Sequence, residues 1–163
     1  MRKIDENGLL VCRIQARAFE LSLNGEYSSP IFLRRFMNSN VAARMDKDGF
    51  IFEACDSRNI LEEIEDEFGK TTYGSEKYSR EEMYWMGYLY RYWAYTYQKT
   101  SRQLYRIIKP KELRELYFPY HSLDPSAAIE RILEARGLTE ADMITRGVAL
   151  LKKIDQASSL QTV

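Results

Sequence analysis

The feature that most constrains the fold of this chain is a cluster of aromatic residues between positions 84 and 97. Eight of these fourteen positions are aromatic: Tyr84, Trp85, Tyr88, Tyr90, Tyr92, Trp93, Tyr95 and Tyr97. On a helix they would point in all directions, and a helix that is apolar all round is either buried centrally or covered by a partner. Because Tyr and Trp also carry polar tips, a partner interface and stacking on nucleic-acid bases are alternatives to a core role.

A capping box predicts where this aromatic helix begins. Ser79 and Glu82 stand three residues apart, so each side chain can accept a hydrogen bond from a backbone N–H group of the first turn. From there the sequence can stay helical to about Ile108. We therefore expect one long helix, with a break near Thr100 and Ser101 as an alternative.

Further helices are predicted from capping residues and from prolines that favour a first turn. The expected N-caps are Ser29, Asp56, Asp124 and Thr139, and the prolines at helix starts are Pro30, Pro110 and Pro125. Apolar stripes at helical spacing support these elements. The stripe after Asp56 is Ile60, Leu61, Ile64 and Phe68, and the stripe of the last helix is Ile144, Val148, Leu151 and Ile154. A short apolar run at 50–52 fits a strand or a buried crossing.

The stretch from Leu9 to Leu23 is ambiguous. Ile14, Ala16 and Ala18 alternate with polar residues, as in a strand, although part of the stretch also fits a helical face. We expect an extended segment or a short hairpin here. The predicted fold is therefore mainly α: a single-domain helical bundle over 1–163 around the aromatic helix. A small N-terminal β element is left open as an addition to the bundle. Residues 1–8 and 158–163 are expected to be frayed.

Composition narrows the class of protein. The chain has 24 Lys and Arg against 24 Asp and Glu, a balance that disfavours a general nucleic-acid binder. No apolar run is long enough for a membrane span, and the first residues lack a signal-peptide core, so we expect a cytoplasmic protein with no membrane partner. Cys12 and Cys55 fit small buried hydrophobes, because two cysteines and one histidine do not make a metal site. We expect no metal and no cofactor.

Charge is segregated along the chain although it balances overall. Seven acids and one base lie between Glu53 and Glu67, whereas six bases and one acid lie between Lys99 and Arg114. The two groups could face solvent and attract each other, or they could be docking surfaces, since charge steers association. The candidate partner-binding residues are Glu62, Glu63, Asp66 and Glu67 on the acidic helix and Tyr88, Arg91, Tyr92 and Tyr95 on the aromatic helix.

One pattern suggests an enzyme. Arg114 and His121 have the approximate spacing of the catalytic Arg and His in the HEPN family of helical ribonucleases, and these two residues would be catalytic if the similarity holds. The residues between them, mostly apolar and including Pro119, depart from that family. We expect His121 to bind Asp124 instead. Residues 100–106 followed by the Pro110 helix match a helix-turn-helix only weakly. A DNA-binding regulator and a ribonuclease are therefore the alternatives to a non-enzymatic protein.

Several phrases of the sequence together resemble a family of small, mostly uncharacterised bacterial proteins. They are SPIFLRRFMNS at 29–39, MYWMGYLYRYW at 83–93, ELRELYFPYHSLDP at 112–125 and IERIL at 129–133. Genes of this family lie beside those of ADP-ribosyltransferase-like toxins. The resemblance, over residues 29 to about 135, implies an antitoxin that binds and silences its cognate toxin. It carries over no catalytic residues. The implied partner is the toxin, and a homodimer through the aromatic helix is a further possibility.

Overall fold

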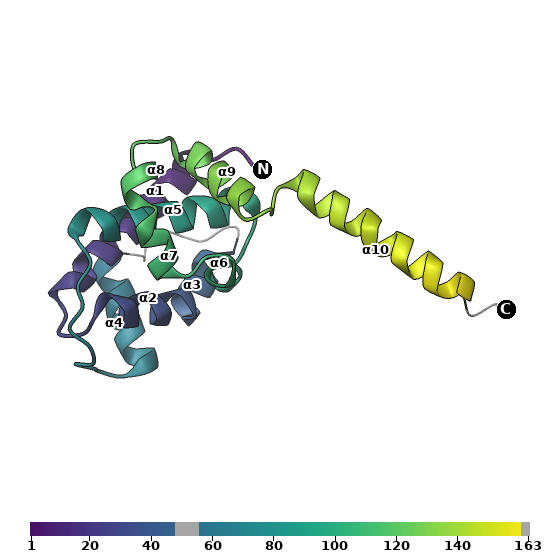
Figure 1. Cartoon of the computed structure of the whole chain (residues 1–163). Helices are drawn as coiled ribbons and strands as arrows, with labels where there is room; N and C mark the ends of the chain where they lie inside the picture. Colours follow the sequence, from purple (N-terminus) through teal and green to yellow (C-terminus); the bar gives the residue numbers. More distant parts are fainter. Residues whose placement is uncertain (48–55, 161–163) are drawn as a thin grey trace. The chain divides into compact units, whose positions relative to one another are not determined.

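The structure is a computed structural model, and it describes residues 1–47 and 56–160. Every regular element of these residues is helical (Figure 1). The chain forms two compact units, residues 1–122 and 123–163. The helices of the first unit are α1 (Glu6–Leu21), the short 3₁₀ turn η1 (Ser22–Asn24), α2 (Ser29–Met37), α3 (Asn40–Met45), α4 (Ser57–Phe68), α5 (Arg80–Tyr97), α6 (Ser101–Ile107), α7 (Pro110–Glu115) and α8 (Tyr117–Tyr120). Those of the second unit are α9 (Pro125–Ala135) and α10 (Glu140–Leu160).

The expected extended segment at the N-terminus is wrong, because residues 6–21 form helix α1. Asp5 caps this helix by accepting a hydrogen bond from the Gly8 backbone N–H at 2.7 Å. The buried residues recur at helical spacing: Gly8, Val11, Cys12, Gln15, Ala16, Ala18 and Phe19. Ala16 and Ala18 are both buried although they are only two positions apart, and this spacing resembles the alternation of a strand. The N-terminal segment before α1 is hydrogen-bonded to α5, since the Arg2 backbone N–H donates to the Thr96 carbonyl oxygen at 2.6 Å.

Helices α1 and α5 form the centre of the first unit and lie side by side in antiparallel directions (Figure 1). Glu20 near the end of α1 pairs with Arg80 at the start of α5. The two backbones approach closely at Gly87, where an added Cβ would lie 2.9 Å from the Ala16 Cα. Only a residue without a side chain fits between the helices at this point.

The aromatic helix is shorter than expected. The capping box of Ser79 and Glu82 is present, but α5 ends at Tyr97 and Gln98 adopts a left-handed conformation with φ 52°. A new helix starts at Ser101 with its own capping box from Thr100 and Gln103, so the alternative with a break is confirmed. The aromatic side chains are divided between core and surface. Tyr90 and Trp93 are buried, whereas Tyr84, Trp85, Tyr88, Tyr92, Tyr95 and Tyr97 are half-buried or exposed.

Helix α2 closes the core against α1 through three phenylalanines. Phe19 meets Phe32 and Phe36 edge-on, at ring-centroid distances of 5.3 and 4.9 Å. The N-cap of α2 is Ser28 rather than Ser29, and Pro30 lies in its first turn. Ser29 is buried instead, and its hydroxyl accepts from the Tyr78 backbone N–H at 3.0 Å.

Helix α4 begins at the predicted N-cap, Asp56. The Asp56 side chain accepts from the Arg58 N–H, and Gly69 ends the helix with φ 82°. The segment 70–78 that follows has no regular secondary structure and is hydrogen-bonded to residues 23–29. The backbone N–H groups of Ser28 and Ser29 donate to the carbonyl oxygens of Tyr73 and Glu76. The predicted apolar run at 50–52 and Cys55 lie outside the described residues.

The second unit consists of two helices. In α9, Ala128, Ile129 and Ile132 are buried, and Asp124 occupies the N-cap position, where its carboxylate accepts from the Ser126 hydroxyl. Thr139 caps α10 as predicted, because its hydroxyl accepts from the Asp142 N–H at 3.2 Å. The predicted inward stripe of α10 is solvent-exposed, with Ile144 at 61 % and Leu151 at 63 %. Within the described residues, no helix has the length and apolar character needed to cross a membrane.

Candidate partner-binding groove

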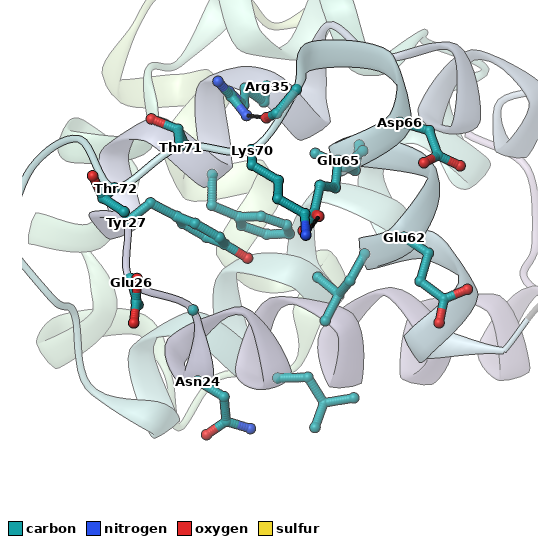
Figure 2. Close-up of a pocket in the computed structure, with 16 residues that line it drawn as sticks. Asn24, Glu26, Tyr27, Arg35, Glu62, Glu65, Asp66, Lys70, Thr71 and Thr72 are labelled. Carbon is teal, nitrogen blue, oxygen red and sulfur yellow. Dashed lines mark hydrogen bonds and ion pairs between the residues drawn. The ribbon is translucent and has the colours of Figure 1, made fainter.

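A groove of about 670 Å³ opens on the first unit beside helix α4 (Figure 2). The second half of α4 forms one wall, and residues 24–27 form another. Residues 69–72 follow α4 and cover one end, while α2 contributes Phe32 and Arg35. The groove thus exists because the segment after α4 is hydrogen-bonded to the turn between η1 and α2.

The floor of the groove is apolar. It contains Leu21, Phe32, Leu61 and Ile64, of which Phe32 and Ile64 are buried. The Tyr27 ring stacks on Phe32 with 18° between the ring planes and 6.5 Å between the centroids. The Lys77 ammonium lies 5.4 Å from the Tyr27 centroid, and it donates to the Gly25 carbonyl oxygen at 2.6 Å. This tyrosine is therefore held in one orientation by its neighbours.

The rim of the groove is acidic. Four carboxylates line it, from Glu26, Glu62, Glu65 and Asp66, against the two cations Arg35 and Lys70. Arg35 already has partners within the protein. Its guanidinium donates to the Gly69 carbonyl oxygen at 2.7 Å and lies 5.5 Å from the Phe68 ring centroid. A rim of carboxylates over an apolar floor is complementary to a basic side chain that neighbours an aliphatic one.

The Tyr27 hydroxyl is a neutral polar group of this groove. Burial raises the pKa of Tyr27, and the nearby Glu65 carboxylate adds to this effect, so the hydroxyl stays protonated at neutral pH. Figure 2 shows Tyr27, Glu65 and Lys70 directed toward the same part of the groove. A hydroxyl beside a carboxylate can accept a hydrogen bond from a cation while it donates to an anion.

The four predicted acidic residues of α4 separate into two pairs. Glu62 and Asp66 are exposed and line the groove. Glu63 and Glu67 lie one position further round the helix and bind α3: Glu63 pairs with Arg44, and Glu67 accepts from the Asn40 backbone N–H at 2.8 Å. The first pair is therefore available to a partner, and the second pair holds α4 against α3.

Arg91 does not lie on a partner surface, in contrast to the sequence-based expectation. Its side chain is 2 % exposed, and its guanidinium donates to Gln15, Asp46 and Ser101 at distances of 2.7 to 3.1 Å. Arginine is usually found at the surface, so its type alone suggested a contact residue. The tertiary fold makes it a buried bridge between α1, α5, the end of α3 and the start of α6.

The three predicted tyrosines of α5 lie apart from the groove. Tyr88 and Tyr92 are half-buried and stack on each other, with 6.4 Å between the ring centroids. The Arg2 guanidinium lies 4.0 Å from the Tyr95 centroid, so this ring serves to hold the N-terminus. The structure brings Glu62 and Asp66 together in one site, but it does not add these tyrosines to it.

Arg114 and His121, the residues of the ribonuclease alternative, have other partners. The Arg114 Nε donates to the Glu82 carboxylate at 2.7 Å, Glu76 lies 3.6 Å away, and the guanidinium lies 4.1 Å from the Tyr78 centroid. The His121 ring stacks on Tyr117, and its Nδ1 lies 2.8 Å from the Tyr117 carbonyl oxygen rather than against Asp124. Carboxylates thus neutralise the arginine that would have to bind a phosphate.

The described cysteine is a buried hydrophobe, as predicted. Cys12 is fully buried, and this burial raises the pKa of its thiol to about 12. A thiol that stays protonated at neutral pH is a poor nucleophile and a poor metal ligand. Within residues 1–47 and 56–160, no cluster of three or more His, Cys, Asp or Glu side chains could hold a metal ion.

Sequence reasoning missed several residues of the groove: Tyr27, Arg35, Lys70, Thr71 and Thr72. In the sequence, the polar segment 70–78 and the Asn24–Gly25 pair carry no sign that they meet. The signal that joins them is a set of backbone hydrogen bonds, including the one from the Ser28 N–H to the Tyr73 carbonyl oxygen at 3.0 Å. Such bonds do not depend on side-chain type, so the sequence carries no trace of them.

Comparison with known proteins yields no relative from which a function could be transferred. No family model matches the chain, and no curated protein and no solved structure is significantly similar to it.

Proposed function

We propose that this protein is a non-enzymatic interaction module, and that it acts as an antitoxin which binds and neutralises a co-encoded toxin. The binding site of this proposal is the groove beside α4, with Glu62 and Asp66 as its accessible carboxylates. The resemblance of residues 29 to about 135 to antitoxin-like bacterial proteins suggests the class of partner, an ADP-ribosyltransferase-like toxin.

The observation that carries the proposal is the acidic rim over an apolar floor. Glu26, Glu62, Glu65 and Asp66 stand around Leu21, Phe32, Leu61 and Ile64 in one groove. Apolar contact supplies most of the affinity of such a site, whereas the charges steer the partner and select its orientation. This combination suits a protein that blocks a basic active-site cleft.

The first experiment is co-expression with the product of the adjacent gene. We expect the neighbour to stop growth when it is expressed alone, and growth to recover when this protein is present. Affinity capture followed by native mass spectrometry should give a complex of fixed stoichiometry. A harmless neighbour together with a lone monomer or homodimer would contradict the proposal.

Charge reversal tests the site. The variant Glu62→Lys with Asp66→Lys should weaken capture of the toxin at least tenfold. The two new lysines on the rim would repel the basic partner. The matched control is Glu130→Lys with Glu134→Lys on α9, two exposed glutamates at the same four-residue spacing. This control changes the net charge by the same amount and should leave capture unchanged. Equal loss in both variants would mean that net charge, rather than the groove, governs binding.

A further inference from the structure

The groove already contains a cation that belongs to the protein itself. Lys70 follows the end of α4 and extends along the groove, where its ammonium lies 3.6 Å from the Glu65 carboxylate (Figure 2). The side chain is 89 % exposed, and that of Glu65 is 48 % exposed. The ammonium therefore occupies the acidic rim without being enclosed by it.

This contact is weak by its geometry. An exposed ion pair at this distance competes with water and salt, and the flexible four-carbon stem of lysine loses entropy when it is held. Arg35, the other cation of the groove, is fixed by its hydrogen bond to the Gly69 carbonyl oxygen. Lys70 can leave the rim without disturbing the backbone, whereas Arg35 cannot.

We infer that Lys70 is an internal placeholder, and that a basic side chain of the protein partner, carried beside an aliphatic residue, displaces it from Glu65. This inference rests on the proposed function and names the chemistry of the partner segment. The incoming cation takes over the Glu65 carboxylate, and Glu62 and Asp66 on the outer edge of α4 add to the negative charge that attracts it. The neighbouring aliphatic side chain covers Leu61 on the floor, which is only half-buried in the free protein.

Displacement has a measurable consequence for affinity. Lys70 contacts Glu65 in the free protein, and the partner must break this contact when it binds. Removal of the lysine side chain should therefore strengthen binding. Because an exposed ion pair is weak, the expected gain is about twofold to fivefold. A residue that helped to bind the partner would give the opposite sign when it is removed.

The probe for this test is the blocked peptide acetyl-Leu-Arg-Leu-amide, titrated into the full chain and followed by ¹H–¹⁵N NMR. The peptide with Glu in place of Arg is the control ligand. We expect the Arg peptide to shift the amide signals of residues around the groove and the Glu peptide to leave them unchanged. Lys70→Ala should bind the Arg peptide about twofold to fivefold more tightly, and Lys111→Ala, an exposed lysine on α7, should bind it as the wild type does.

A second signal separates displacement from a general change of charge. The ¹H–¹³C signal of the Lys70 ε-methylene group should move during the titration, with the same dissociation constant as the amide signals. A signal that does not move at saturation would overturn the inference, and so would unchanged or weaker binding of the peptide to Lys70→Ala.

The outcomes for this inference and for the proposed function are distinguishable. If the toxin is captured and the Glu62→Lys with Asp66→Lys variant loses it, but Lys70→Ala brings no gain, the placeholder role is refuted while the function stands. If Lys70→Ala strengthens peptide binding but the adjacent gene product is neither toxic nor captured, the groove chemistry stands and the antitoxin proposal falls.

Discussion

Arg91 and Asp46 form an ion pair inside the first unit, with 2.8 Å between Nη1 and Oδ1 and side-chain exposures of 2 % and 7 %. The Asp46 carboxylate also accepts from the backbone N–H and the hydroxyl of Ser101. Gln15 completes the cluster, since it accepts from Arg91 and donates to the Gly87 carbonyl oxygen. One guanidinium thus joins parts of the chain that lie far apart in sequence.

Replacement of Arg91 should therefore destabilise the fold. Arg91→Met leaves the Asp46 carboxylate buried without its cation, a change that costs about 3–5 kcal/mol when one member of a buried pair is removed. Urea denaturation followed by circular dichroism measures this loss. Arg34→Met on the exposed face of α2 is the control and should change stability by less than about 0.5 kcal/mol. A stable Arg91→Met variant would mean that Arg91 is not enclosed as described.

Two helical glycines provide a matched test of close packing. An added Cβ at Gly87 would lie 2.9 Å from both the Ala16 Cα and the Phe19 Cγ, whereas at Gly147 of α10 it would meet nothing within 4 Å. Gly87→Ala should destabilise the protein by about 1–3 kcal/mol, because α1 and α5 must separate. Gly147→Ala gains up to about 1 kcal/mol of helix propensity without a clash. In thermal unfolding, Gly87→Ala should lower the melting temperature. Gly147→Ala should raise the melting temperature or leave it unchanged.

The ion pair of Glu82 and Arg114 makes stability depend on pH. Burial alone would raise the pKa of Glu82, but hydrogen bonds from Arg114 and Ser79 outweigh it and lower the pKa below its ordinary value. Since the folded pKa is the lower one, the stabilisation is complete above the unfolded pKa and is lost as the pH falls through the folded pKa.

Glu82→Gln should remove about 1 kcal/mol at pH 7 and flatten the loss of stability below about pH 4.3, the ordinary pKa of glutamate. Urea midpoints at pH 7, 4 and 3 measure both effects. The neighbouring Glu81→Gln, an exposed position of the same turn, is the control and should retain the slope of the wild type. Parallel pH profiles of the wild type and Glu82→Gln would refute the role of this pair.

Helix α10 carries an apolar stripe that is exposed to solvent. Its residues Met143, Ile144, Leu150 and Leu151 are 60 to 63 % exposed, so they bury little apolar area in this structure. A chain that ends at residue 138 should therefore keep its melting temperature within about 2 °C, and it should bind less of a hydrophobic dye because an exposed apolar stripe is gone. A clear drop in melting temperature would show that the stripe of α10 packs against another surface in solution.

Local signals in the sequence determined several of the helix boundaries. Ser79 with Glu82, Asp56 with Gly69, and Thr139 with Asp142 act within a few residues, so their geometry does not depend on the rest of the fold. The same holds for the prolines in the first turns of α2, α7 and α9. These signals are the reason why an α-helical fold could be predicted without a structure.

The N-terminal helix shows where local pattern fails. The buried face of α1 includes both Ala16 and Ala18, which are two residues apart and therefore imitate a strand. What decides the outcome is contact with α5, where Gly87 lets the backbone of α1 approach. Packing overrides a weak local preference for a strand. Burial of the helical face against α5 contributes more stabilisation than the alternation of small residues could give in a strand.

The sequence by itself determined that the chain is helical, that α4 carries an acidic face, and that Cys12 belongs to the core. Only the tertiary structure decided which charges are accessible. Glu62 and Asp66 are exposed at the outer edge of the groove while Glu63 and Glu67 bind α3, and Arg91 lies in the core although its type predicts a surface. The physical reason is that helix capping and periodicity act over a few residues, whereas burial of a charge and closure of a groove depend on segments that meet only after folding.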